Sequence, residues 1–218
     1  MDDAQVERLF ATLSAANPHP VSELEFSSVF ELLAAVLLSA QATDAGVNKA
    51  TRRLFAVAAT PQRMRALGVA GLEPYIRSIG LYRTKARHLI ASCQRLVEQH
   101  HGTVPRDREA LQALPGVGRK TANVVLNVAF GEATFAVDTH VFRVCNRTGV
   151  APGATPLAVE LGLQQRVPER YRGHAHHWLI LHGRYICLAR RPLCERCPVA
   201  GVCDYARAQA RAQVPPLQ

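Results

Sequence analysis

This sequence has few lysines and lacks any run of residues that could span a membrane. Lys49, Lys85 and Lys120 are the lysines among 26 basic residues, so arginine supplies nearly all of the positive charge. The longest apolar run, residues 32–38, is too short to cross a bilayer, and the acidic start after Met1 lacks the features of a signal peptide. We therefore expect a soluble, intracellular protein of the cytoplasm.

The pattern of half-buried β-strands is also missing. No stretch alternates apolar and polar residues between hairpin turns, whereas helical signals recur along the whole chain. Ser28 opens a capping box, Asp44 and Asp107 are expected helix caps, and Gly102 should close a long helix. The sequence predicts an all-α fold with helices over 28–40, 44–57, 61–68, 69–80, 84–101, 107–114, 119–130, 139–148, 156 onward and 173–187, followed by a frayed helix and Pro-containing tail over 206–218.

The net charge points to a polyanionic partner. A formal charge of +9 over 218 residues suits a surface that meets nucleic acid. An anionic membrane is the competing partner, but the basic residues are spread along the chain and form no basic amphipathic helix. We expect DNA binding that weakens steeply as the salt concentration rises.

The segment 114–120, Leu-Pro-Gly-Val-Gly-Arg-Lys, predicts a phosphate-binding turn. Gly116 and Gly118 allow a tight turn and a close approach to another molecule, and the first amides of a helix over 119–130 would point at an anion there. Lys120 would stand on the first turn of this helix. In an arginine-rich chain, a lysine here is a candidate nucleophile, although a lysine that only contacts phosphate remains an open alternative.

Four of the six cysteines form the pattern Cys187-x6-Cys194-x2-Cys197-x5-Cys203. Thiols this close in a reducing compartment indicate a metal centre rather than disulfides. The spacing alone leaves zinc and an iron-sulfur cluster both open, because it contains one Cys-x2-Cys pair with longer arms on each side. The remaining two, Cys93 and Cys145, lie in helical patterns and are expected to be buried small hydrophobic residues. Between the ligands lie Arg190, Arg191 and Arg196, which would form a platform for phosphate contacts.

Taken together, these segments resemble the endonuclease III family of the helix-hairpin-helix DNA glycosylase superfamily. The resemblance runs from about residue 17 to 205. It rests on 37–44, 79–82, 114–120, 137–140 and 177–184 together with the cysteine pattern.

The resemblance implies two helical lobes with a DNA-binding cleft between them. One domain would span 22–132 and contain the helix-hairpin-helix at about 107–130. The second would combine 1–21 with 133–218 and carry a [4Fe-4S] cluster on the four cysteines of 187–203. The implied protein is a monomer that binds duplex DNA containing oxidised pyrimidines or abasic sites.

The implied activity is that of a bifunctional DNA glycosylase and abasic-site lyase. By this resemblance, Lys120 attacks the sugar C1′, displaces the damaged base and forms a Schiff base, after which β-elimination breaks the 3′ phosphodiester bond. Asp138 matches the aspartate that assists this step. From the residues alone, Asp138 is equally an N-cap for the helix that follows it.

A base must leave the stack before its sugar can react. The resemblance places Gln41 and Leu81 in the gap that the flipped nucleotide leaves. It also suggests a base pocket near Ser39, Asp44 and His140. The expected DNA-binding residues are Gln41, Leu81, Gly116, Gly118, Arg119 and Arg191.

Three other functions compete with this interpretation. A related glycosylase that removes adenine from mispairs would have another residue in place of Lys120 and a further C-terminal domain. A DNA-binding module without catalysis would be favoured by replacement of both Lys120 and Asp138, and neither is replaced. An electron-transfer protein would depend on a reductase partner.

Overall fold

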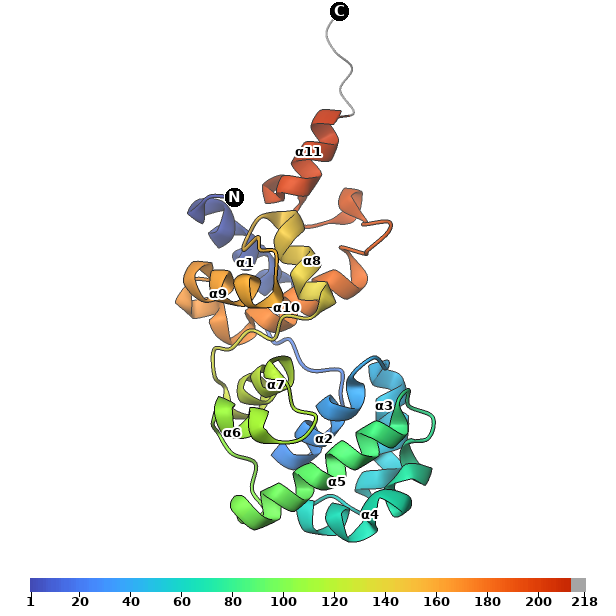
Figure 1. Ribbon diagram of the computed structural model, residues 1–218. Helices are drawn as coiled ribbons and strands as arrows, with labels where there is room; N and C mark the ends of the chain where they lie inside the picture. Colours follow the sequence, from blue (N-terminus) through green and yellow to red (C-terminus); the bar gives the residue numbers. More distant parts are fainter. Residues whose placement is uncertain (213–218) are drawn as a thin grey trace, which may run out of the picture. The chain divides into compact units, whose positions relative to one another are not determined.

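The computed structural model describes residues 1–212, and every regular element in that range is an α-helix or a short 3-10 helix (Figure 1). The prediction of an all-α fold is confirmed. Residues 213–218, the end of the expected tail, lie outside the described residues. The chain divides into two compact units, Ser22–Glu132 and Met1–Val21 with Ala133–Gln218. Among residues 1–212, no helix combines the length and apolar character needed to cross a membrane.

The unit Ser22–Glu132 is built around one apolar helix. Because α2 (Val29–Ser39) is apolar on all sides, it is buried along almost its whole length. It packs against α3 (Asp44–Phe55), α5 (Tyr82–Gln99) and α7 (Arg119–Phe130). The unit is completed by α4 (Pro61–Ile76) and α6 (Arg108–Ala113).

Several helix boundaries differ from the expected ones. The side chain of Thr43, not Asp44, caps α3, because Thr43 is the extended residue and its Oγ1 accepts from the Gly46 amide at 3.2 Å. The expected break between two helices at Gly68 is confirmed, since Gly68 has φ of +63° and interrupts α4, but the second helix ends at Ile76 rather than near residue 80. Helix α5 begins at Tyr82 rather than at residue 84, and Leu81, at its N-cap position, lies in the left-handed region.

The second unit contains α1 (Asp3–Ala16), α8 (Thr139–Thr148), α9 (Pro156–Arg166), α10 (Arg172–Tyr185) and α11 (Asp204–Ala212) (Figure 1). Between them lie the 3-10 helices η1 (Glu169–Tyr171), η2 (Cys194–Arg196) and η3 (Ala200–Val202). The sequence analysis did not delimit α1, although Asp2 and Gln5 form a capping box at its start. Helices α8 and α10 cross closely at Gly183, where a Cβ would lie 2.8 Å from the Cβ of His140.

Candidate active site and metal centre

The turn between α6 and α7 is seated on α5. Gly116 has φ of +79°, and a Cβ there would lie 2.8 Å from the His88 side chain, so only glycine fits without a shift. The Ser92 hydroxyl donates to the Pro115 carbonyl at 2.7 Å, and Arg95 donates to the Ala113 carbonyl. The position of the turn is therefore set by one face of α5.

Gly118 has a different role from Gly116. Its φ of −88° is one that any residue can adopt, and a Cβ on Gly118 would meet no atom within 4 Å. The expectation of a glycine required for a tight turn thus holds for Gly116 only. As N-cap of α7, Gly118 leaves the positive end of the helix accessible. Lys120 lies exposed on the first turn beyond it, next to the half-buried Arg119.

Asp138 is the N-cap of α8. Its Oδ1 accepts hydrogen bonds from the amides of His140 and Val141, both at 2.9 Å. The N-cap interpretation is therefore confirmed, and it leaves Oδ2 outside the cap. Asp138 belongs to the unit of Met1–Val21 and Ala133–Gln218, whereas Lys120 belongs to Ser22–Glu132.

Gln41 and Leu81 share an uncommon backbone conformation. Both have positive φ, 53° and 59°, and Leu81 is 62 % exposed, which is high for a leucine. A Cβ on Gly80 would lie 3.8 Å from the Gln41 carbonyl oxygen, so the two loops are neighbours. Half-buried Ser39 and Asp44 flank Gln41 at the end of α2 and the start of α3. The structure brings these four residues together within one unit.

Lys85 is a buried lysine that the sequence did not single out. Lys85 is 5 % exposed, and its Nζ donates to the carbonyls of Leu38 and Ala40 at 2.9 and 2.6 Å. Burial lowers the pKa of this ammonium group from its ordinary value. A single buried lysine among mostly exposed basic residues left no pattern in the sequence by which it could have been recognised.

The four cysteines of the C-terminal pattern line one pocket. Cys187, Cys194, Cys197 and Cys203 all contribute to its wall. In the part of the chain that the structure describes, no three His, Cys, Asp or Glu side chains are placed to hold a single metal ion. Four thiols that line one shared space are a donor set that suits an iron-sulfur cluster.

The loop of residues 187–203, called the cluster loop, holds the four cysteines in buried or half-buried positions. Burial raises the pKa of the Cys197 and Cys203 thiols, and the neighbouring cysteines act in the same direction. The Nε2 of His182 lies 3.7 Å from the Cys197 sulfur. Iron ligation is what would hold such crowded, partly buried sulfurs as thiolates.

Two arginines of α8 that the sequence analysis missed hold this loop. Arg143 donates to the carbonyls of Cys187 and Gly183 at 2.9 and 2.7 Å, and its Nη2 lies 3.3 Å from His140 Nδ1. Arg147 donates to the carbonyls of Leu188 and Ala189, both at 2.7 Å, and to the Cys187 sulfur at 3.5 Å. Their spacing of four residues on one helix was the available signal. Both side chains connect the helix that Asp138 caps with the cluster loop.

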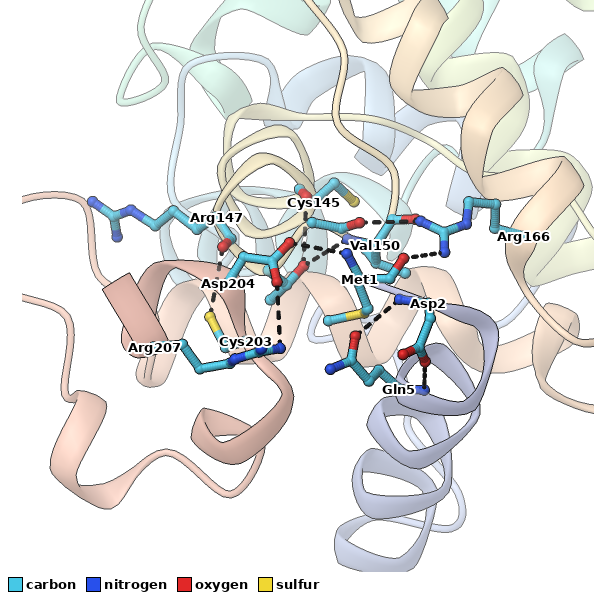
Figure 2. Close-up of polar contacts among 12 residues, drawn as sticks. Met1, Asp2, Gln5, Cys145, Arg147, Val150, Arg166, Cys203, Asp204 and Arg207 are labelled. Atoms are coloured by element: carbon cyan, nitrogen blue, oxygen red, sulfur yellow. Dashed lines mark hydrogen bonds and ion pairs between the residues drawn. The ribbon is translucent and has the colours of Figure 1, made fainter. Parts of the chain in front are cut away.

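Cys203, the last cysteine of the pattern, lies next to contacts made by Met1 and by α8. Figure 2 shows Asp204, which follows Cys203, paired with the Met1 amino group at 3.1 Å. Arg166 donates to the Met1 carbonyl at 2.6 Å, and the Cys203 thiol lies 3.6 Å from the Arg147 carbonyl. The chain start and α8 thus fix the end of the cluster loop.

The remaining predicted residues lie where the sequence suggested. Arg190, Arg191 and Arg196 are exposed on the cluster loop. Cys93 and Cys145 are fully buried, which confirms that they are core residues. Burial raises the pKa of Cys93 to about 12 and raises that of Cys145 as well, so neither thiol is a reactive group.

Comparison with known proteins agrees with this geometry. Residues 34–169 match the model of the HhH-GPD superfamily of base excision DNA repair proteins, and residues 187–203 match the iron-sulfur binding domain of endonuclease III. The chain is 58 % identical to endonuclease III of Escherichia coli (strain K12), covering 94 % of this chain and 97 % of that protein. It is 57 % identical to endonuclease III of Haemophilus influenzae, with 90 % and 93 % coverage.

A solved structure gives the same result. A trapped endonuclease III–DNA covalent intermediate superposes with a TM-score of 0.90 at 44 % identity and covers 97 % of this chain and all of that one. The match extends over both the hairpin and the cysteine loop. On this identity and coverage, the chain belongs to the endonuclease III family of the HhH-GPD superfamily of base excision DNA repair proteins.

Proposed function

We propose that this protein removes oxidised pyrimidines from duplex DNA and cuts the strand 3′ to the resulting abasic site, with Lys120 as nucleophile. Its family membership makes it a DNA glycosylase and abasic-site lyase of base excision repair. The residue assignment is carried by the position of Lys120, which is exposed on the first turn of α7. The N-terminal end of this helix, just after the hairpin turn, is accessible to phosphate.

In the proposed reaction, the unprotonated Lys120 amine donates its lone pair to C1′ while the bond from C1′ to the base breaks. The base leaves with the electron pair of the broken bond. Proton loss and opening of the sugar ring give a C1′=N Schiff base, and removal of a C2′ proton then expels the 3′ phosphate. The structural relative named as a trapped covalent intermediate with DNA supports such a covalent step.

Asp138 is the proposed partner of this chemistry. Because its Oδ1 is occupied by two α8 amides, Oδ2 is the oxygen that would stabilise the cationic sugar and move protons. Replacing Asp138 by asparagine should keep the cap, whereas alanine should lose about 1 kcal/mol of stability. Both variants should slow base excision and strand cleavage about 100-fold, measured in single turnover beside melting curves. An Asp138→Asn variant as fast as the native protein would contradict the role of the carboxylate.

The other proposed DNA contacts follow from position. Gln41 and Leu81 would fill the gap left by the flipped nucleotide, since both lie exposed on adjacent loops. Ser39, Asp44 and His140 would line the base pocket. Phosphate contacts are assigned to Gly116, Gly118, Arg119 and Arg191.

The family also carries a [4Fe-4S] cluster, and this chain has the residues for it. Cys187, Cys194, Cys197 and Cys203 would hold it, and it would supply a rigid support for the loop that carries Arg191. We propose that the units Ser22–Glu132, with the hairpin, and Met1–Val21 plus Ala133–Gln218, with the cluster, are the functional domains of a monomer that acts on cytoplasmic DNA.

The decisive test uses cluster-loaded protein and four duplexes, which contain a single thymine glycol, the undamaged thymine, an adenine mispair or an abasic site. We expect release of the oxidised base and strand cleavage on the first duplex, strand cleavage on the abasic duplex, and no reaction on the other two. Release of adenine from the mispair without cleavage would identify the related mispair glycosylase instead. If none of the four duplexes reacts, the proposal is wrong.

A further inference from the structure

Lys85 is buried in a chain whose basic residues are mostly exposed. Its ammonium group donates to the carbonyls of Leu38 and Ala40, which lie at the C-terminal end of α2. The last carbonyls of a helix have no partner within the helix, and a cation there also meets the negative end of the helix dipole. Lys85 therefore satisfies and fixes the end of α2.

The residue that follows this helix end is Gln41. Only three non-glycine residues among residues 1–212 have positive φ, namely Gln41, Leu81 and His101. Such conformations persist where the surrounding structure holds them in place, and they concentrate at functional sites. Two of the three are the residues assigned to the DNA gap.

Lys85 is bonded to both of these loops. Its side chain holds the Ala40 carbonyl, which belongs to the peptide bond that leads into Gln41. Its backbone amide donates to the Leu81 carbonyl at 3.0 Å in the first turn of α5. The loops themselves adjoin, because a Cβ on Gly80 would lie 3.8 Å from the Gln41 carbonyl oxygen.

The same helix also positions the hairpin turn. Ser92, seven residues after Lys85 on α5 and therefore on the same face, donates to the Pro115 carbonyl at 2.7 Å. One face of α5 thus contacts both the exposed pair of loops and the proposed phosphate-binding turn. Helix α5 therefore sets the spacing between the proposed phosphate-binding turn and the loop residues Gln41 and Leu81.

We propose that Lys85 is a positioning residue that fixes Gln41 and Leu81 as one rigid wedge for opening the base stack. This inference rests on the proposed function, in which Gln41 and Leu81 fill the gap left by the flipped nucleotide. Lys85 does not touch the reacting atoms. Its effect is to keep two exposed side chains at a constant separation.

The test compares Lys85→Met with the matched control Lys49→Met, which removes an exposed lysine of α3. Two quantities are measured, the single-turnover rate of thymine glycol excision and the fluorescence of 2-aminopurine placed beside the lesion, which rises when the stack opens. For Lys85→Met we expect excision about 10- to 100-fold slower, because misplacement by about 1 Å has effects of this size, and a smaller fluorescence rise. Lys49→Met should behave as the native protein.

A double-mutant cycle separates positioning from general damage to the fold. In a Gln41→Ala, Leu81→Ala background, adding Lys85→Met should slow excision no further, since the wedge it positions is gone. A native excision rate and a native fluorescence rise for Lys85→Met would overturn the proposal. It would also be overturned if Lys85→Met slowed excision by the same factor in the Gln41→Ala, Leu81→Ala background as in the native protein. Lys85→Gln, which keeps two N–H donors, replaces Lys85→Met in every assay if melting curves show that the methionine variant is unfolded. Failure of the native protein to excise any base would count against the proposed function instead.

Discussion

Replacement of Lys120 by alanine should abolish both base excision and covalent trapping on a duplex with a single thymine glycol. The proposed reaction runs through a covalent bond to the Lys120 amine, and alanine has no atom that could form it. We expect excision to slow by at least about 1,000-fold. Borohydride reduces a Schiff base to a stable amine, which keeps the protein bound to the DNA on a denaturing gel. This protein–DNA adduct should be absent for Lys120→Ala.

The control for this experiment is Lys49→Ala, which removes an exposed lysine outside the hairpin. It should form the adduct at the native rate. DNA binding by Lys120→Ala should be retained, because the turn at Gly116 and the accessible end of α7 do not depend on the lysine side chain. An adduct formed equally well by Lys120→Ala would assign the nucleophile to another amine.

Removal of Cys197, one of the proposed cluster ligands, should have the second large effect, this time on stability. Serine in place of Cys197 keeps the size of the side chain but ligates iron poorly, and the loop 187–203 has only the short helices η2 and η3 with Val199 and Val202 buried. Metal binding contributes about 10–16 kcal/mol to folding in small zinc-dependent domains, so the loss of a ligand at a structural metal centre is costly. We expect loss of iron and of visible absorbance, and a melting temperature lower by at least about 10 °C.

Cys93→Ala provides the matched control for Cys197→Ser. Cys93 is fully buried in the other compact unit, so its replacement removes packing without touching the cluster. Iron content and visible absorbance should equal those of the native protein. A Cys197→Ser variant that keeps its full iron content and melting temperature would show that the loop folds without this ligand.

Local features of the fold followed from local chemistry. The apolar run before Ser39 predicts an apolar helix, and Asp107 and Asp138 were recognisable as caps because a cap needs only its own side chain and the next few amides. The change of cap from Asp44 to Thr43 shows the limit of this reasoning. Both residues are good caps, and the choice depends on which one the preceding chain leaves extended.

Without the family resemblance, the candidate site was predictable only where its residues are close in sequence. Gly116, Gly118 and Lys120 lie within five positions, and the four cysteines lie within seventeen, so their order and spacing carry the chemistry. Arg143 and Arg147 escaped notice because their partners, the Cys187 sulfur and the carbonyls around it, lie about forty residues away.

The sequence by itself determined the helical class, the hairpin with its lysine and the spacing of the four cysteines, since each depends on side chains that are neighbours along the chain. The tertiary structure alone decided that Lys85 is buried against the end of α2 and that Gln41 and Leu81 lie on adjacent loops with positive φ. The physical reason is that a carbonyl left unpaired at a helix end can be satisfied by any donor that the fold brings near it. Here the donor comes from 45 to 47 residues further along the chain, and no local pattern records that pairing.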